Sequence, residues 1–129
     1  MGRLIVLATL VASIAALAAA SAAPAHGGGA EVIKRGSCSG SADWKLKAKH
    51  DDGRIETEFE VDQNRVGRKW RVVIRQNGVT RFSGIRTTKP PSGSFTVRRF
   101  LDNEAGSDRI VAKARALAAG QTCRGALTI

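Results

Sequence analysis

Between residues 43 and 62, apolar and charged residues alternate with a period of two, which is typical of half-buried β-strands. The dipeptide Asp52-Gly53 interrupts the alternation and favours a two-residue hairpin turn. A hairpin closed at this turn has a core face with the opposed pairs Trp44–Val61, Leu46–Phe59 and Ala48–Thr57. Its other face pairs bases with acids, as Lys45–Glu60, Lys47–Glu58, Lys49–Glu56 and Asp51–Arg54. The apolar pattern, the turn and the charges therefore predict the same hairpin register.

A second hairpin is predicted around the dipeptide Asn77-Gly78, after a strand that turns Val72 and Ile74 toward the core. A two-residue loop would set Arg81 opposite Ile74 and bring a charge onto the core face. A three-residue loop with a left-handed glycine instead sets Phe82 opposite Val72. We predict the three-residue loop, because a slip of one residue exchanges the two faces of a strand.

Turn sequences divide the rest of the chain into short segments with strand character. Residues 109–117 are ambiguous, because their alanines favour a helix whereas their alternation of apolar and basic residues favours a strand. We predict a strand there, since the neighbouring segments are strands. The seven predicted strands cover residues 43–51, 54–62, 69–76, 79–87, 95–101, 109–117 and 121–129. This pattern predicts an all-β, seven-stranded antiparallel sandwich.

The N-terminal residues 1–25 are predicted to be a secretory signal peptide. Arg3 supplies the positive start, and an uncharged, alanine-rich apolar run follows it. We place the cleavage after Ala25, with Ala22 and Ala23 as alternative sites. An uncleaved membrane anchor is the other interpretation, but the apolar run is short and weakly hydrophobic for a membrane span. The protein is therefore expected to be secreted.

Cleavage leaves a loose, flexible N-terminal segment at 26–36 and a β-sandwich domain at 37–129. Cys38 and Cys123 are the two cysteines of the chain, and an even number in a secreted protein predicts a disulfide. Such a bond would close a loop of about 85 residues, worth on the order of 4 kcal/mol in the chain-entropy model. Cys38 also lies in a Gly-Ser-Cys-Ser-Gly sequence similar to a nucleophile elbow, but that motif needs the strand-turn-helix of a large α/β sheet.

Residues 104–114, followed by Gly120 and a last strand, resemble the final hairpin of immunoglobulin-like domains, and Trp70 resembles the tryptophan of their third strand. The predicted hairpin of the third and fourth strands is more similar to the fibronectin type III arrangement. This resemblance implies that the first and last strands are neighbours, which suits a Cys38–Cys123 bond. With its leader and single bridge, the chain also resembles small uncharacterised secreted proteins of actinobacteria, and that resemblance implies no catalytic residues.

The sequence contains no recognisable catalytic or metal-binding motif. His26 and His50 do not share a strand face, and the cysteines are too far apart for zinc spacing. Asp51-Asp52-Gly53 is too short for a calcium loop. The acids at 56–62 are explained by their lysine partners as a solvated strand face. We therefore expect a non-catalytic protein without a cofactor, with an enzyme lacking a sequence signature as the alternative.

The positive charge is unevenly distributed along the chain. There are 21 Lys and Arg residues against 11 Asp and Glu, giving a net charge of +10. Residues 63–101 carry ten of these bases and no acid, and we expect most of that charge on the second sheet. The bases predicted to share one outer face, and hence to be candidate anion-binding residues, are Arg71, Arg75, Arg81, Arg109, Lys113, Arg115 and Arg124.

A face of this kind would attract anionic polymers, and arginine forks suit phosphate, sulfate and carboxylate groups. We therefore expect binding of an anionic polymer or cell-envelope component, such as wall teichoic acid, extracellular nucleic acid or a sulfated glycan. A purely solubilising surface is the equal alternative. Two further hypotheses are a protein-partner or structural module of the cell surface, using sheet edges or exposed Val73, Val111 and Leu117, and a small-ligand carrier or inhibitor. Few aromatics remain outside the core, which argues against base stacking.

Overall fold

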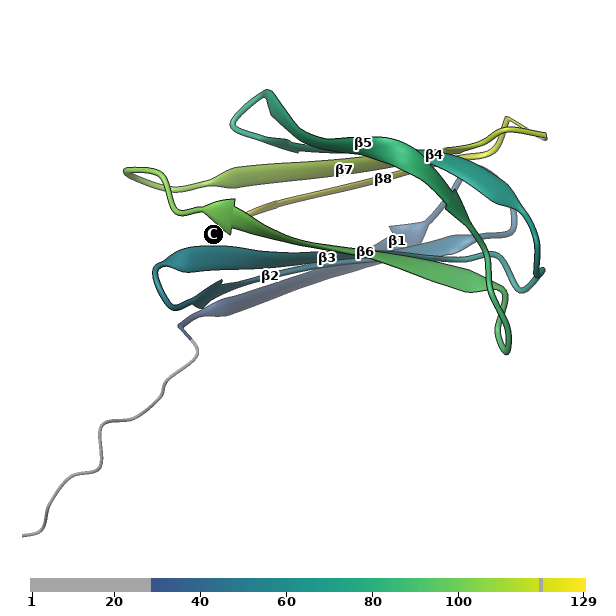
Figure 1. Cartoon of the computed structure of the whole chain (residues 1–129), viewed down its shortest axis with the longest axis horizontal. Coiled ribbons are helices and arrows are strands. Elements are labelled where there is room, and N and C mark those ends of the chain that lie inside the picture. The colour runs from purple at the N-terminus through teal and green to yellow at the C-terminus, as the bar shows by residue number, and fades with distance from the viewer. Residues whose placement is uncertain (1–28, 119) are drawn as a thin grey trace, which may run out of the picture.

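The computed structural model describes residues 29–118 and 120–129, which form two antiparallel four-stranded sheets packed face to face (Figure 1). The strands are β1 (Glu31–Ser37), β2 (Asp43–Asp51), β3 (Arg54–Asp62), β4 (Lys69–Gln76), β5 (Val79–Thr87), β6 (Ser94–Asp102), β7 (Arg109–Ala116) and β8 (Thr122–Thr128). The first sheet has the order β1-β2-β3-β6 and the second has the order β5-β4-β7-β8. The predicted signal peptide lies outside the described residues.

The first predicted hairpin is confirmed along its whole length. β2 and β3 pair with Trp44 opposite Val61, and every base–acid pair from Lys45–Glu60 to Asp51–Arg54 is in register. Asp52 and Gly53 both have positive φ values, of 52° and 75°, as a two-residue turn of this type requires. Local signals alone were sufficient here because the apolar pattern, the turn and the charges act on the same few residues.

The prediction of seven strands is wrong by one, because β1 adds an eighth at the edge of the first sheet. The sequence predicts a flexible segment at 26–36, yet residues 31–36 of it pair with β2 from Glu31–Lys49 to Gly36–Trp44. Lys34 and Arg35 occupy consecutive positions and are exposed, so the apolar alternation that marks the other strands is missing. An edge strand is held mainly by its backbone hydrogen bonds to one neighbour, which leave little trace in the side-chain pattern.

The second hairpin has the predicted strands but a different register. A two-residue turn at Asn77-Gly78, with φ values of 50° and 82°, joins β4 to β5, so the three-residue loop is wrong. A β-bulge then leaves Arg81 without a cross-strand partner and sets Phe82 opposite Ile74, not opposite Val72. The bulge shifts β5 by one residue, which returns Phe82 to the core face while keeping the tight turn.

The ambiguous segment at 109–117 forms strand β7, and its alanines belong to the core. They lie opposite the large residues of β4, in the pairs Trp70–Ala116, Val72–Ala114 and Ile74–Ala112. Trp70, Val72 and Ile74 are fully buried, as are Leu46, Ile55, Phe59 and Ile110. Small residues beside large ones let the two inner faces interdigitate, so alanine here reflects core packing and not helix propensity.

The predicted disulfide between Cys38, just after β1, and Cys123 in β8 is confirmed, and it links the edges of the two sheets. Disulfides persist in oxidising compartments, so this bond indicates an extracellular type of environment. The described residues contain no free cysteine.

Beside the disulfide, the half-buried Trp44 of β2 occupies a narrow slot between β1 and β8. A Cβ atom at Gly36 would lie 2.7 Å from Trp44 Cζ2, and one at Gly125 would lie 2.7 Å from Cζ3. Both distances are too short for a carbon–carbon contact, which is favourable at about 3.5–4.0 Å. The two glycines therefore let the indole pack between the open edges of the sandwich.

The Gly125→Ala substitution tests this slot. We expect it to lower the free energy of unfolding by about 1–3 kcal/mol, because overpacking forces the indole or the strand to move. Urea unfolding followed by far-UV circular dichroism measures the change. In a Trp44→Ala background the added methyl group meets no indole, so the cost of Gly125→Ala should largely disappear. Equal costs in the two backgrounds would show that Trp44 does not impose the glycine.

Candidate functional site

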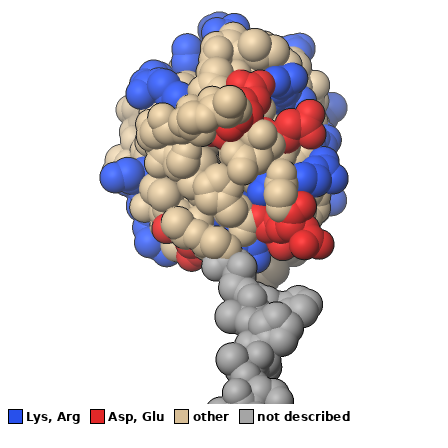
Figure 2. Space-filling model, turned by 90° about the vertical axis from the view of Figure 1, so that its left-hand side faces the viewer, with Lys and Arg blue, Asp and Glu red and all other residues tan. Residues whose placement is uncertain are grey.

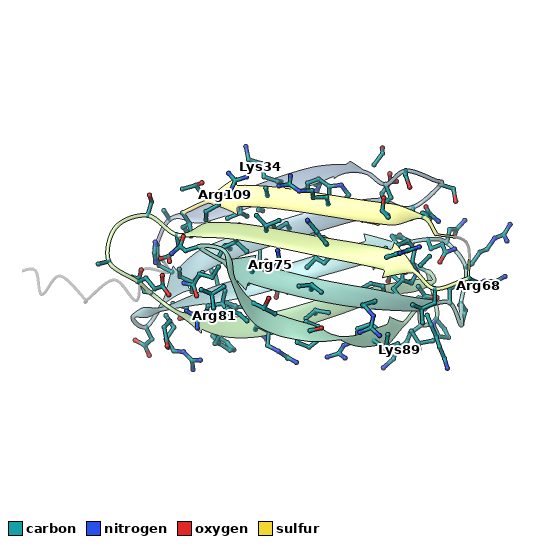
Figure 3. All side chains as sticks on the ribbon, turned by 90° about the horizontal axis from the view of Figure 1, so that it is seen from above. Lys34, Arg68, Arg75, Arg81, Lys89 and Arg109 are labelled. Atoms are coloured by element: carbon teal, nitrogen blue, oxygen red, sulfur yellow. A yellow bond between two sulfur atoms is a disulfide. The ribbon has the colours of Figure 1, made fainter. Side chains whose placement is uncertain are left out.

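The outer surface of the sheet β5-β4-β7-β8 is dominated by basic side chains. Side chains alternate between the two faces of a strand, so the residues between the buried core positions of β4, β7 and β8 point to solvent. Seven of these outward positions carry a base, and we call this set the basic face: Lys69, Arg71, Arg75, Arg109, Lys113, Arg115 and Arg124. No described residue at an outward position of the four strands is acidic. Figure 3 looks onto this face, with Arg75 near its centre.

Within the basic face, like charges lie directly opposite one another. Arg71 of β4 is the cross-strand partner of Arg115 of β7, and Lys113 of β7 is the partner of Arg124 of β8. Opposed positions on neighbouring strands have Cβ atoms about 5 Å apart, and like charges at that separation are destabilising. The fold therefore tolerates a local cost in the middle rows of this face. In the first sheet the like-charge pairs are Asp43–Asp62 and Arg35–Lys45, and four rows of its hairpin oppose a base to an acid.

No acid compensates these charges. The ion pairs among the described residues use only Lys47, Lys49, Arg81 and Arg98 as bases. None of the seven side chains of the basic face takes part in one. The charge of the face is therefore available to a ligand from solution.

Two adjoining hollows are found on this surface. The larger has a volume of about 450 Å³ and lies over Val73 and Val111, with Arg75, Arg109, Lys113 and Arg124 around it. The second, of about 360 Å³, shares Val73, Lys113 and Arg124 with the first and extends to Arg71 and Arg115. Val73 and Val111 are half-buried, whereas Leu117, which was also expected to be exposed, is 53% exposed. The valines thus form an apolar floor between the bases.

Of the predicted candidates, Arg81 alone lies apart from this face. The bulge in β5 directs it to the end of the sandwich, where its Nη2 lies 2.6 Å from Glu104 Oε1 and its Nε donates to Gln76 Oε1. Figure 3 shows Arg81 at the β5 margin, away from Arg75. The other six predicted residues share the face. Lys69 was missed as a candidate, although it precedes Arg71 by two positions in the same alternating pattern.

The acid-free stretch 63–101 places five of its ten bases in strands β4 and β5 of the second sheet, so the expectation that most of its charge lies there is only half met. Only Lys69, Arg71 and Arg75 of its ten bases belong to the basic face. Arg86 and Arg99 stack on the Phe82 ring, with their Cζ atoms 4.8 and 4.4 Å from its centroid. Arg65, Arg68 and Lys89 lie in loops, and Arg81 and Arg98 pair with acids. The face is completed instead by bases from β7 and β8.

The outer face of the first sheet has a mixed charge pattern. The lysines of β2 lie opposite the acids of β3, and Arg98 of β6 adds a further base beside them. Figure 2 looks along the strands and shows basic side chains along the upper rim, at the second sheet, and acidic side chains below that rim, interspersed with basic ones. The two sheets therefore differ in charge: the first is nearly balanced and the second is positive.

Glu56 is the most buried acid of the first sheet, with 3% of its side chain exposed. Arg98 Nη2 lies 2.7 Å from its Oε1, and Lys49 Nζ lies 3.5 Å from its Oε2. Burial by itself would raise the pKa of Glu56, but the charges of Arg98 and Lys49, and their hydrogen bonds, hold that pKa below its usual value of 4.5. Arg98 is thereby occupied within the protein.

The described part of the chain contains no cluster of three or more His, Cys, Asp or Glu residues that could hold a metal ion. It also contains no helix that could cross a membrane. No protein-family model, no curated protein and no solved structure matches this chain. Function must therefore be argued from the basic face itself.

The Glu56 carboxylate makes stability depend on pH. A carboxyl whose pKa is lower in the folded state stabilises the fold above its unfolded value, and this contribution is lost as the pH falls through the folded value. We therefore expect Glu56→Gln to lower the free energy of unfolding at pH 7 and to flatten its decrease below about pH 4.5. Urea unfolding between pH 7 and pH 3 measures both effects. Glu60→Gln is the control, because the described residues offer Glu60 no ion pair. An equal flattening by the control would contradict the role of Glu56.

The like-charge pairs of the basic face predict a variant that is more stable than the natural protein. Arg115→Glu replaces the repulsion with Arg71 by an attraction, so we expect a gain of roughly 0.5–1 kcal/mol in the free energy of unfolding at low salt. The gain should shrink in 1 M salt, where charges are screened within about 3 Å. Arg115→Gln should give a smaller gain. A loss of stability at low salt in both variants would show that the repulsion is not felt.

Proposed function

We propose that this chain is a secreted, non-catalytic β-sandwich protein that binds anionic polymers through the basic face. The observation that carries this proposal is the arrangement of seven bases on one sheet surface, with two like-charge pairs directly opposed and no acid at any outward position. A cost in folding stability at a surface is expected where that surface serves binding.

A purely solubilising role explains this arrangement less well. Solubility depends on net charge and on the absence of apolar patches, and it favours positive and negative charges interspersed on the surface. The outer face of the first sheet has that mixed pattern: acids and bases alternate on it, and its like-charge pairs, Arg35–Lys45 and Asp43–Asp62, are of opposite sign to each other. The second sheet departs from it in the same chain, so a selective reason for the basic face is the better account.

The strand arrangement supports an immunoglobulin-like fold of the fibronectin type III kind. If β1 is taken as an N-terminal addition, the remaining seven strands divide into β2-β3-β6 and β5-β4-β7-β8. In immunoglobulin constant domains the fourth strand lies in the sheet of the first, second and fifth strands. Here the fourth of the seven, β5, pairs with the third strand, β4, in the opposite sheet. Such folds carry many functions, so the surface and not the fold supports the binding proposal.

Secretion is supported by two independent features. The N-terminal sequence has the charge, apolar run and small-residue sites of a signal peptide. The Cys38–Cys123 disulfide would be stable in the oxidising compartment to which that signal leads. A polymer of the cell envelope or of the surroundings is then the kind of partner that the basic face would meet.

Two variants of equal net charge test the proposal. Arg71→Gln/Lys113→Gln/Arg124→Gln removes three charges from the basic face, and Lys34→Gln/Arg35→Gln/Lys45→Gln removes three from the first sheet. The second set makes no ion pair among the described residues. Affinity for fluorescent heparin as a function of salt is the measurement. We expect the first variant to bind at least tenfold more weakly than the control at 100 mM salt, with a shallower salt dependence.

Circular dichroism establishes that both variants remain folded. If both lose affinity equally, net charge alone governs binding and the basic face has no special role. If the natural protein fails to bind heparin even at 20 mM salt, the proposed function itself is wrong.

A further inference from the structure

The bases of the basic face form a ladder along the strand direction. The cross-strand register groups the outward positions of β4, β7 and β8 into successive rows. Five consecutive rows each contain at least one base, in the order Lys69, then Arg71 with Arg115, then Lys113 with Arg124, then Arg75, then Arg109. Rows two residues apart are separated by about 6.6 Å along a strand. Along the strand direction the ladder thus offers positive charge at a regular interval, while the bases themselves come from all three strands, β4, β7 and β8.

This interval matches one type of polyanion. Two residues of an extended polypeptide contribute six covalent bonds to the backbone. A chain whose phosphodiesters are separated by three carbon atoms also has six bonds from one phosphorus atom to the next. An extended polymer of this type can therefore lie parallel to the strands with one phosphate at each row. A chain with five carbons between phosphates has eight bonds per repeat, so the spacing of its phosphates would be longer than the spacing of the rows.

Nucleic acids also have three carbon atoms between phosphates, and the surface between the basic side chains distinguishes them from a polymer without nucleobases. Nucleic acids carry bases that single-strand-binding proteins hold by stacking on aromatic side chains. No described outward residue of β5, β4, β7 or β8 is aromatic, and the floor of the hollows is formed by Val73 and Val111. Short aliphatic units fit against these valines, whereas nucleobases would gain no stacking there. The face therefore favours a polymer without nucleobases.

We propose that the basic face binds an extended 1,3-linked polyglycerol phosphate chain, laid parallel to the strands with one phosphate at each of the five rows. This proposal rests on the proposed function and names the polymer, its direction and the number of phosphates engaged. Arginine forks at Arg71, Arg75, Arg109, Arg115 and Arg124 offer two donors to a phosphate in four of the five rows, and the two lysines act as point charges, with Lys69 alone in the first row.

Synthetic oligomers of defined length provide the test. Fluorescein-labelled glycerol phosphate oligomers with three, five and eight phosphates are titrated with the mature protein, and anisotropy gives Kd at 50 and 150 mM salt. We expect at least a tenfold gain from three to five phosphates and only a small further gain at eight. With five phosphates, log K should fall with log salt with a slope of about −3.5, as for five contacts on a single-stranded polyanion.

A variant of the two end rows locates the ligand on the ladder. In Lys69→Gln/Arg109→Gln, the gain from three to five phosphates should fall to less than threefold, because the outer phosphates lose their partners. The control Lys34→Gln/Arg35→Gln has the same net charge and should keep the full gain. Equal length dependence in the two variants would overturn the assignment of one phosphate to each row.

Two further ligands distinguish the polymer class. A ribitol phosphate oligomer with 1,5 linkages and five phosphates should bind at least fivefold more weakly than its glycerol counterpart, because its phosphates do not match the rows. Equal affinity of the two oligomers would overturn the match between phosphate spacing and rows. It would not contradict the proposed function, because both oligomers would still bind as anionic polymers. A thymidine pentanucleotide that binds more than tenfold tighter than an abasic one of the same length would instead identify a nucleic-acid site.

Discussion

The two-residue period of the β-strand is the constraint on which the whole structure depends. Each residue that enters the core sends its two neighbours to solvent, so the inner and outer faces of a strand are specified together. In β4, the burial of Trp70, Val72 and Ile74 fixes the outward position of Arg71 and Arg75. The bulge at Arg81 shows how strictly the period is kept. Without it, the tight turn at Asn77-Gly78 would bring a charge into the core, and with it the charge moves to the end of the sandwich.

Both sheets obey this constraint, but they differ in the charges that they carry on their outer faces. In the first sheet, Lys47 and Lys49 have acidic partners across the strand, and burial of Glu56 is compensated by two bases. In the second sheet, the pattern of buried residues determines which residues point outward but not their charge. The outward residues are nevertheless all neutral or basic. Repulsion between opposed bases is modest for each pair, and it is tolerable because the buried core and the disulfide stabilise the sheet independently.

Local patterns were sufficient to predict seven of the eight strands and one hairpin register, but not the features that depend on distant residues. The β2–β3 hairpin followed from its turn and its paired charges. β1 was missed because an edge strand with consecutive Lys34 and Arg35 has no alternation to detect. The bulge in β5 was missed because it depends on packing against the opposite sheet. Six of the seven candidate bases do lie together on the basic face, because the alternation of side chains along a strand alone decides on which side of the sheet each one lies.

The positions of Arg86, Arg98 and Arg99 illustrate what local sequence does not contain. All three lie in the acid-free stretch, so the carboxylate that pairs with Arg98 and the ring that Arg99 contacts come from distant parts of the chain. Arg98 is neutralised by Glu56, which is more than forty residues away in sequence, on the neighbouring strand β3. Arg86 and Arg99 reach the same Phe82 ring from different sheets, across the open side of the sandwich. A count of bases along the chain therefore overstates the charge available to a ligand.

The edge strand β8 connects the stability of the sandwich to the geometry of the basic face. Arg124, which borders both hollows, lies between Cys123 and Gly125 in the sequence. These two neighbours point inward: Cys123 is bonded to Cys38, and Gly125 lies against Trp44. An edge strand has only one hydrogen-bonded neighbour and is otherwise free to fray. The disulfide and the indole therefore hold the backbone on either side of Arg124, and so keep this base, the only one that β8 contributes to the basic face, beside Lys113.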